Sequence, residues 1–166
     1  MRLTEHAHAA VREVLRPGET AVDATAGNGH DTRFLSGIVG PAGHVFAFDI
    51  QPEAIARTAA WGLANVTLSQ RSHAELASAI PMEHHGRIGA VMFNLGYLPG
   101  GDKSVRTVAE STEAALRAGL ALLRPGGILS AMAYTGHPGG LDEVAVIERV
   151  LAGYDVREVA SEPGAV

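Results

Sequence analysis

Two residues near the middle of the chain have side chains suited to orienting a nucleophile. They lie in the stretch FNLGYLPGGDKS, which follows an apolar segment. Asn94 offers a carboxamide oxygen that can accept N–H bonds, and Tyr97 offers a ring that can stack on a substrate. An amine must shed water and aim its lone pair before it attacks carbon. We therefore expect Asn94 and Tyr97 to be catalytic, with Asp102, a histidine or water taking the proton.

Basic residues follow in the same loop, where a helix is expected to begin. Lys103 is the only lysine of the chain, and Arg106 follows it closely. A helix start presents free N–H groups that favour anions, so we expect both side chains to meet a phosphate of the acceptor. Arg33 and Arg71, near other strand ends, are further candidates for a basic cluster. The alternative for each is an ordinary solvated arginine.

A second candidate site is the glycine-rich stretch VDATAGNGHD, which lies between an expected strand and its helix. Gly27 and Gly29 allow the backbone to approach a ligand closely, and the next helix offers free N–H groups. A dinucleotide fingerprint would need a third glycine where this chain has Thr32. Asp49 ends the next strand, FAFDI, where a carboxylate can accept hydrogen bonds from both hydroxyls of a ribose. The stretch therefore predicts a nucleotide-like cofactor.

The elements that would position these residues alternate between strand and helix. Expected strands are 20–25, 44–50, 65–70, 88–95, 127–134 and a last one at 154–160. Expected helices are 4–15, 32–39, 52–63, 72–79, 105–123 and 141–151. Such alternation predicts an α/β fold with a doubly wound, mostly parallel sheet and helices on both faces. At 166 residues, the chain is expected to form one domain spanning 1–166.

Composition narrows the classes of function. The net charge of −5 argues against a basic surface covering the whole molecule, so a nucleic-acid substrate would need a local cluster. No apolar stretch approaches the roughly 20 residues of a membrane span, and we expect a soluble, cytoplasmic protein. The absence of cysteine excludes disulfides and thiolate metal sites. His84 and His85 lack accompanying carboxylates at ligand spacing, so no metal site is expected.

Three motifs resemble those of class I S-adenosylmethionine methyltransferases. The segment from Asp23 to Gly29 matches the D/E-x-G-x-G-x-G loop, with Thr25 in place of the first glycine. Asp49 and the turn LLRPGGIL have counterparts in the same class. Methylases of amine nitrogens often place an Asn/Asp-Pro-Pro-Tyr/Phe tetrapeptide after strand four, and NLGY keeps its two ends but not its prolines.

A more specific resemblance covers nearly the whole chain. The stretches DATAGNGHDTRFL, VFAFDIQPEAI, SQRSH, NLGYLPGGDKS and YTGHPGG are similar to a bacterial family of tRNA 5-(aminomethyl)-2-thiouridine methyltransferases, formerly labelled putative rRNA methylases. The resemblance implies methyl transfer from S-adenosylmethionine to the amine of an aminomethyl group on the wobble uridine, in the anticodon region of tRNA.

The resemblance also implies two sets of site residues. The cofactor pocket would be lined by Asp23, Thr25, Gly27, Asn28, Gly29, Asp31, Thr32, Asp49, Ile50, Gln51, Ser72, His73 and Asn94. The substrate would be bound by Tyr97, Gly100, Gly101, Lys103, Arg106 and His137.

The chain departs from the family pattern at its end. Family members continue into an Asn- and Pro-rich segment and a final strand, whereas this sequence ends at SEPGAV. We expect the C-terminal strand to be missing, which would leave an exposed sheet edge. Either the chain is truncated or the edge is covered in another way, such as by the second subunit of a homodimer.

The residues alone leave other functions to be weighed. The acceptor could be ribosomal RNA or a small-molecule amine, since either would share every cofactor residue. The chain could also be a module that binds S-adenosylmethionine without catalysis, although Asn94 and Tyr97 argue against this. A dehydrogenase is disfavoured by Thr32.

Overall fold

Five parallel strands form the centre of the fold. The computed structural model describes residues 1–96, 109–134 and 140–159. The strands are β1 (Thr20–Asp23), β2 (His44–Asp49), β3 (Val66–Gln70), β4 (Ile88–Leu95) and β5 (Leu123–Ala133). Their order is β3-β2-β1-β4-β5, and every neighbouring pair is parallel. The order switches direction between β1 and β4, and sheets of this kind bind ligands beyond the strand ends at that point.

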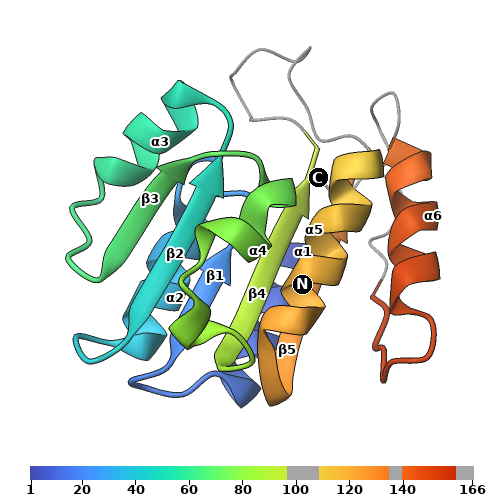
Figure 1. Cartoon of the computed structure of the whole chain (residues 1–166), viewed down its shortest axis with the longest axis horizontal. Coiled ribbons are helices and arrows are strands. Elements are labelled where there is room, and N and C mark those ends of the chain that lie inside the picture. The colour runs from blue at the N-terminus through green and yellow to red at the C-terminus, as the bar shows by residue number, and fades with distance from the viewer. Residues whose placement is uncertain (97–108, 135–139, 160–166) are drawn as a thin grey trace.

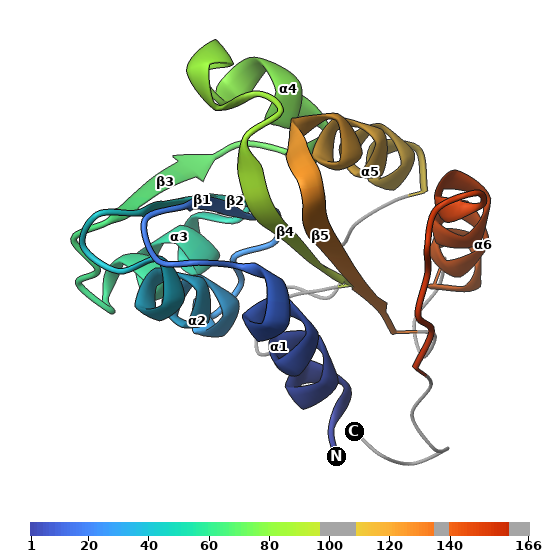
Figure 2. The same cartoon turned by 90° about the horizontal axis from the view of Figure 1, so that it is seen from below.

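Helices cover both faces of the sheet. They are α1 (Leu3–Val14), α2 (His30–Val39), α3 (Pro52–Ala59), α4 (Leu76–Ala79), α5 (Ala109–Leu122) and α6 (Gly140–Leu151), with 3-10 turns at His73–Glu75 and Met82–His84. Figures 1 and 2 show α1, α2 and α3 on one face and α4 and α5 on the other, with α6 beside α5. This arrangement confirms the expected doubly wound α/β fold.

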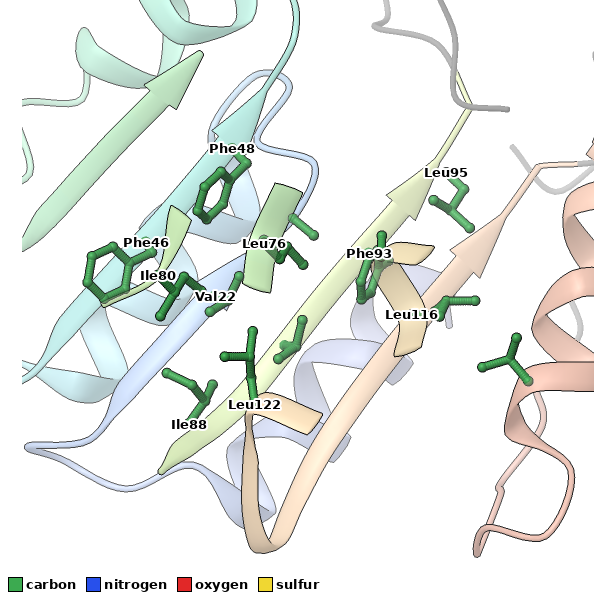
Figure 3. Packing of buried hydrophobic residues seen from close by; sticks show 14 of the residues in the cluster. Val22, Phe46, Phe48, Leu76, Ile80, Ile88, Phe93, Leu95, Leu116 and Leu122 are labelled. Atoms are coloured by element: carbon green, nitrogen blue, oxygen red, sulfur yellow. The ribbon is translucent and has the colours of Figure 1, made fainter. Parts of the chain in front are cut away.

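Buried apolar side chains fill both sides of the sheet. One cluster, shown in Figure 3, includes Phe48, Phe93 and Leu116 and lies against α4 and α5. The other includes Leu35 and Met92 and lies against α1 and α2. Successive side chains of β4 point to opposite faces of the sheet and so belong to opposite clusters. Because both faces are buried, the strand is a nearly continuous apolar stretch.

Most expected elements agree with the structure, with shifted ends. β4 has the expected bounds, whereas α2 begins two residues early, at His30. α3 ends at Ala59 because a turn follows, with Trp61 N–H bonded to the Thr58 carbonyl and Gly62 at a φ of 65°. β5 begins at Leu123, the residue at which we expected the preceding helix to end, and so it includes the turn expected at 124–126. Residues 105–108 of the expected long helix lie outside the described part.

The strand expected at 154–160 is wrong. No strand is assigned from Tyr154 to Val159, the described part of this segment. Tyr154, Val156 and Val159 remain 58%, 53% and 41% exposed. Tyr and Val favour strands by residue type, but side chains this exposed gain little packing that would stabilise pairing with the sheet. β5 is therefore an edge strand of the described sheet.

The described residues contain no helix that is both long enough and apolar enough to span a bilayer.

Candidate functional site

Asp23 anchors the start of the glycine loop. Its side chain is fully buried at the end of β1. One carboxylate oxygen accepts the Thr25 N–H at 3.1 Å, and the other accepts the Thr32 hydroxyl at 2.6 Å. Burial, together with the nearby Asp31 charge, raises the pKa of Asp23 to about 7. Asp23 and Thr32 therefore join the strand to the first turn of α2 from beneath the loop.

The glycine loop turns sharply and packs against the end of α3. Gly27 and Gly29 have φ angles of 56° and 85°, in the left-handed region that favours glycine. A Cβ on Gly29 would lie 2.7 Å from Cδ1 of Trp61 and 3.0 Å from Cα of Thr58. The Thr58 hydroxyl also donates to the Gly27 carbonyl at 3.3 Å. Both glycines are thus needed for the local backbone path.

Asp49 lies directly beside this loop, as the sequence predicted. At the end of β2, its Oδ2 accepts the Gly27 N–H at 3.0 Å, and its Oδ1 accepts the Gln51 N–H at 2.9 Å. A carboxylate has about four acceptor positions, so two remain for further donors. Asp49 is half-buried, the neighbouring Ile50 is 48% exposed, and Gln51 is buried. The geometry fits a carboxylate fixed in place with unused acceptor capacity.

A hydrogen bond joins the glycine loop to the end of β4. The Asn94 N–H donates to the Thr25 hydroxyl at 2.6 Å, although the two residues are far apart in sequence. The Asn94 side chain is half-buried, and its carboxamide forms no hydrogen bond to another described residue. The structure thus brings the two stretches predicted to carry the chemistry into contact across the switch point.

Asn28 and Asp31 contact residues that sequence reasoning did not select. The Asn28 side-chain oxygen accepts from Arg57 at 2.9 Å, and its carbonyl accepts from the Trp61 ring N–H at 3.0 Å. Asp31 is 9% exposed and lies 2.6 Å from His8 of α1. None of these partners has a distinctive sequence signal, because each depends on how the helices pack.

The residues after β3 show two different environments. The Ser72 hydroxyl accepts the Ala74 N–H at 3.1 Å and so caps the 3-10 turn. His73 is 6% exposed, and burial lowers its pKa to about 4. Its ring lies 5.8 Å from that of Phe93 on β4. His73 is therefore a neutral ring at pH 7 that follows β3 in the chain and lies near Phe93 of β4.

Several predicted residues lie outside the described part of the chain. They are Tyr97, Gly100, Gly101, Asp102, Lys103, Arg106 and His137. Within the described part, no group of three or more His, Asp or Glu residues could hold a metal ion.

The fold and the loop geometry define the class of protein. A parallel sheet in this order, with a glycine loop after β1 and an acid at the end of β2, is the fold of class I methyltransferases. Residues 45–161 match the protein family described as "Putative rRNA methylase", and the chain belongs to this family.

Two solved structures of bacterial relatives are similar over most of the chain. One is described as a putative rRNA-methylase from Clostridium thermocellum and is 39% identical, with a TM-score of 0.85. That match covers 93% of this chain and 84% of that one. A putative methyltransferase from Streptococcus mutans, crystallised in complex with SAH, is 32% identical with a TM-score of 0.79. Its match has the same two coverages, 93% and 84%.

A curated plant protein is similar as well. The chloroplastic tRNA (mnm(5)s(2)U34)-methyltransferase of Arabidopsis thaliana is 39% identical over 170 residues. The match covers 95% of this chain but 61% of the plant protein, so the chain spans less than two-thirds of that relative. These comparisons confirm the family that the sequence motifs predicted.

Proposed function

We propose that this chain is an S-adenosylmethionine-dependent methyltransferase that binds its cofactor at Gly27 to Asp31, with the ribose on Asp49. The observation that carries the proposal is the 3.0 Å bond from Gly27 N–H to Asp49, which fixes the carboxylate beside the glycine loop. A relative of 32% identity is described in complex with SAH, which supports this choice of cofactor.

The residues present fit this cofactor. Asp49 keeps acceptor capacity for ribose hydroxyls, and the two glycines leave the loop free of side chains. Ile50, 48% exposed after the end of β2, offers apolar surface of the kind that an adenine requires. When bound, S-adenosylmethionine supplies an electrophilic methyl group, so the protein itself need form no covalent intermediate.

The acceptor we propose is the amine of an aminomethyl group on the wobble uridine of tRNA. Asn94 lies at the end of β4, against the cofactor loop, with its carboxamide available to accept amine N–H bonds. The name of the Arabidopsis relative supports this acceptor. In this proposal Tyr97 stacks on the base, Lys103 and Arg106 contact phosphate, and Asp102 is one candidate for the proton acceptor.

Ribosomal RNA is the second candidate acceptor, because the matching family is described as a methylase of rRNA. A small-molecule amine and binding without catalysis are the remaining alternatives. Labelled S-adenosylmethionine incubated with tRNA, rRNA and a panel of small amines separates them. We expect label in tRNA alone. Label only in rRNA or in small amines would reject the tRNA acceptor, and binding without any transfer would reject catalysis.

We also propose the domain organisation, the compartment and the oligomeric state of the enzyme. Residues 1–166 act as one methyltransferase domain, in a compartment that contains tRNA, which for a bacterial protein is the cytoplasm. A homodimer is also proposed, since β5 is an edge strand of the described sheet and its residues 127–131 are only half-buried. Sedimentation at micromolar concentration tests the dimer.

A further inference from the structure

Six arginines of the described residues form two groups that differ in their partners. One group forms ion pairs with glutamates and consists of Arg71, Arg117, Arg124 and Arg149. Arg12 and Arg33 instead lie over aromatic rings, with Cζ 5.1 Å from the centre of Phe34 and 4.5 Å from the ring of Trp61, respectively. Neither has an ion-pair partner within the described ranges. Their positive charges are held in place without being neutralised.

These two arginines belong to one surface on α1, α2 and the end of α3. Two hollows of about 440 and 460 Å³ adjoin there and share the exposed His30. The first is also lined by Asn28, Arg57 and Trp61, and the second by His8, Arg12, Arg33 and Phe34. No carboxylate is among the described residues that line either hollow. We call this surface, defined by Arg12, Arg33, Arg57, His8, His30, Phe34 and Trp61, the arginine face.

The aromatic rings of Phe34 and Trp61 hold the two guanidinium groups in position. A cation over an aromatic face is attracted by the ring, yet it keeps its charge and its outward N–H donors. Because each side chain is already positioned, less conformational entropy is lost when it binds an anion. The His8 ring stacks on Phe34 at 3.8 Å, which further fixes that ring. The nearby Asp31 is 9% exposed and is already in contact with His8.

The arginine face begins at the glycine loop. His30 directly follows Gly29, and the Trp61 ring N–H bonds the Asn28 carbonyl. Figure 2 shows α1, α2 and α3 on one face of the sheet. The second hollow is lined by His30, Arg33 and Gly37, so the surface extends from the loop along α2. A polyanion held here would continue to the site where the acceptor reacts.

We propose that the arginine face binds backbone phosphates of the RNA acceptor, with Arg12 and Arg33 as the principal contacts. This inference rests on the proposed RNA-methylating function and adds a binding surface on α1–α3 to it. The protein has a net charge of −5, so RNA requires a local cluster of this kind. Trp61, 37% exposed, and His30 offer ring surface to unstacked bases, which suits a single-stranded loop better than a rigid duplex.

The test compares two double variants that remove the same charge. Arg12→Gln/Arg33→Gln alters the arginine face, whereas Arg117→Gln/Arg149→Gln removes two arginines that both pair with Glu113. Fluorescence anisotropy measures the affinity for tRNA across a salt series, and calorimetry with S-adenosylhomocysteine measures cofactor binding. We expect the first variant to bind tRNA roughly tenfold more weakly, with a salt slope reduced by about 1–2, as expected for two lost phosphate contacts. Cofactor affinity should stay at the wild-type value in both variants.

Three outcomes would overturn the inference. Equal tRNA affinity and salt slope in the two variants, with wild-type tRNA methylation intact, would reject the arginine face and leave the proposed function standing. A loss of polyglutamate binding without a loss of tRNA binding would assign the surface to an acidic protein partner. A wild-type protein that neither binds nor methylates RNA would reject the proposed function, and this inference with it.

Discussion

At the scale of single residues, Asp49 is the group on which the proposed cofactor site depends most. Its two oxygens already accept the N–H groups of Gly27 and Gln51, so its orientation is fixed before any ligand arrives. Asp49→Ala should cost about 2–3 kcal/mol of cofactor affinity, because two charge-assisted bonds to the ribose are lost. Calorimetry with S-adenosylhomocysteine measures this loss. Glu53→Ala, at an exposed acid in the first turn of α3, is the matched control. Wild-type affinity in a folded Asp49→Ala protein would show that the ribose is held elsewhere.

Variants of Asn94 test whether this residue acts in the methyl-transfer step or in cofactor binding. If its carboxamide oxygen orients the amine, Asn94→Ala should bind cofactor normally but turn over about 10²-fold more slowly, the scale of a lost positioning contact. Asn94→Asp should retain more activity, since a carboxylate still accepts N–H bonds. Single-turnover assays with saturating cofactor give the two rates. Equal loss in both folded variants would indicate a structural amide, and unchanged turnover in Asn94→Ala would remove the argument for amine methylation.

Asp23 predicts a dependence of stability on pH. Burial raises its pKa from 3.8 to about 7, so the folded protein retains a proton that the unfolded chain has already released. Stability from this group is therefore greatest at low pH and decreases as the pH rises from about 4 to about 7. Asp23→Asn should lack this decrease. Urea unfolding across that range gives the difference in unfolding free energy between the two proteins. A difference that stays constant with pH would contradict a raised pKa.

Some contacts of the candidate site could be predicted from the sequence and others could not. Asp49 and the glycine pair were predictable, because a strand followed by glycines and a strand ended by an acid have recognisable patterns. The contact of His8 with Asp31 was not, since it depends on how α1 packs against α2. The same holds for Arg33 on Trp61, a contact between the start of α2 and the end of α3.

At the scale of elements, the glycine loop is held between β1 and α3. Gly29→Ala should destabilise the fold by about 1–3 kcal/mol, because the new Cβ would meet Trp61 at 2.7 Å in a backbone conformation with φ of 85°. Gly62→Ala is the matched control, since its φ is 65° but nothing lies within 4 Å of a Cβ there. Urea unfolding compares the two variants. Equal destabilisation would mean that backbone strain alone, and not packing on Trp61, requires a glycine at this position.

Element types were more predictable than element ends. β4 agreed from Ile88 to Leu95, because an unbroken apolar stretch is typical of a parallel strand buried on both faces. The ends of α2 and α3 were shifted, since a left-handed Gly29 starts one helix and a turn at Trp61 stops the other. The expected strand after α6 was wrong because residue types that favour strands, such as Tyr154, Val156 and Val159, form one only where a neighbouring strand or face covers them.

At the scale of the whole molecule, arginines that form ion pairs and arginines that lie over aromatic rings occupy different parts of the surface. Ion pairs neutralise Arg117 and Arg149 on α5 and α6, while the arginine face on α1–α3 keeps its cations beside the cofactor loop. Composition revealed only the net charge of −5 and the need for a local cluster. The location of that cluster depended on the fold, because Arg12, Arg33 and Trp61 come from α1, α2 and the turn after α3.

The most direct test of the central claim is nucleoside analysis of tRNA after incubation with the enzyme and S-adenosylmethionine. Two matched substrates are required: tRNA that carries the aminomethyl group on its wobble uridine, and the same tRNA without that group. We predict that one methyl group is added to the wobble uridine of the first tRNA and that the second is unchanged. Methylation of both tRNAs at the same nucleoside, or of neither while the protein binds cofactor, would contradict the proposed amine acceptor.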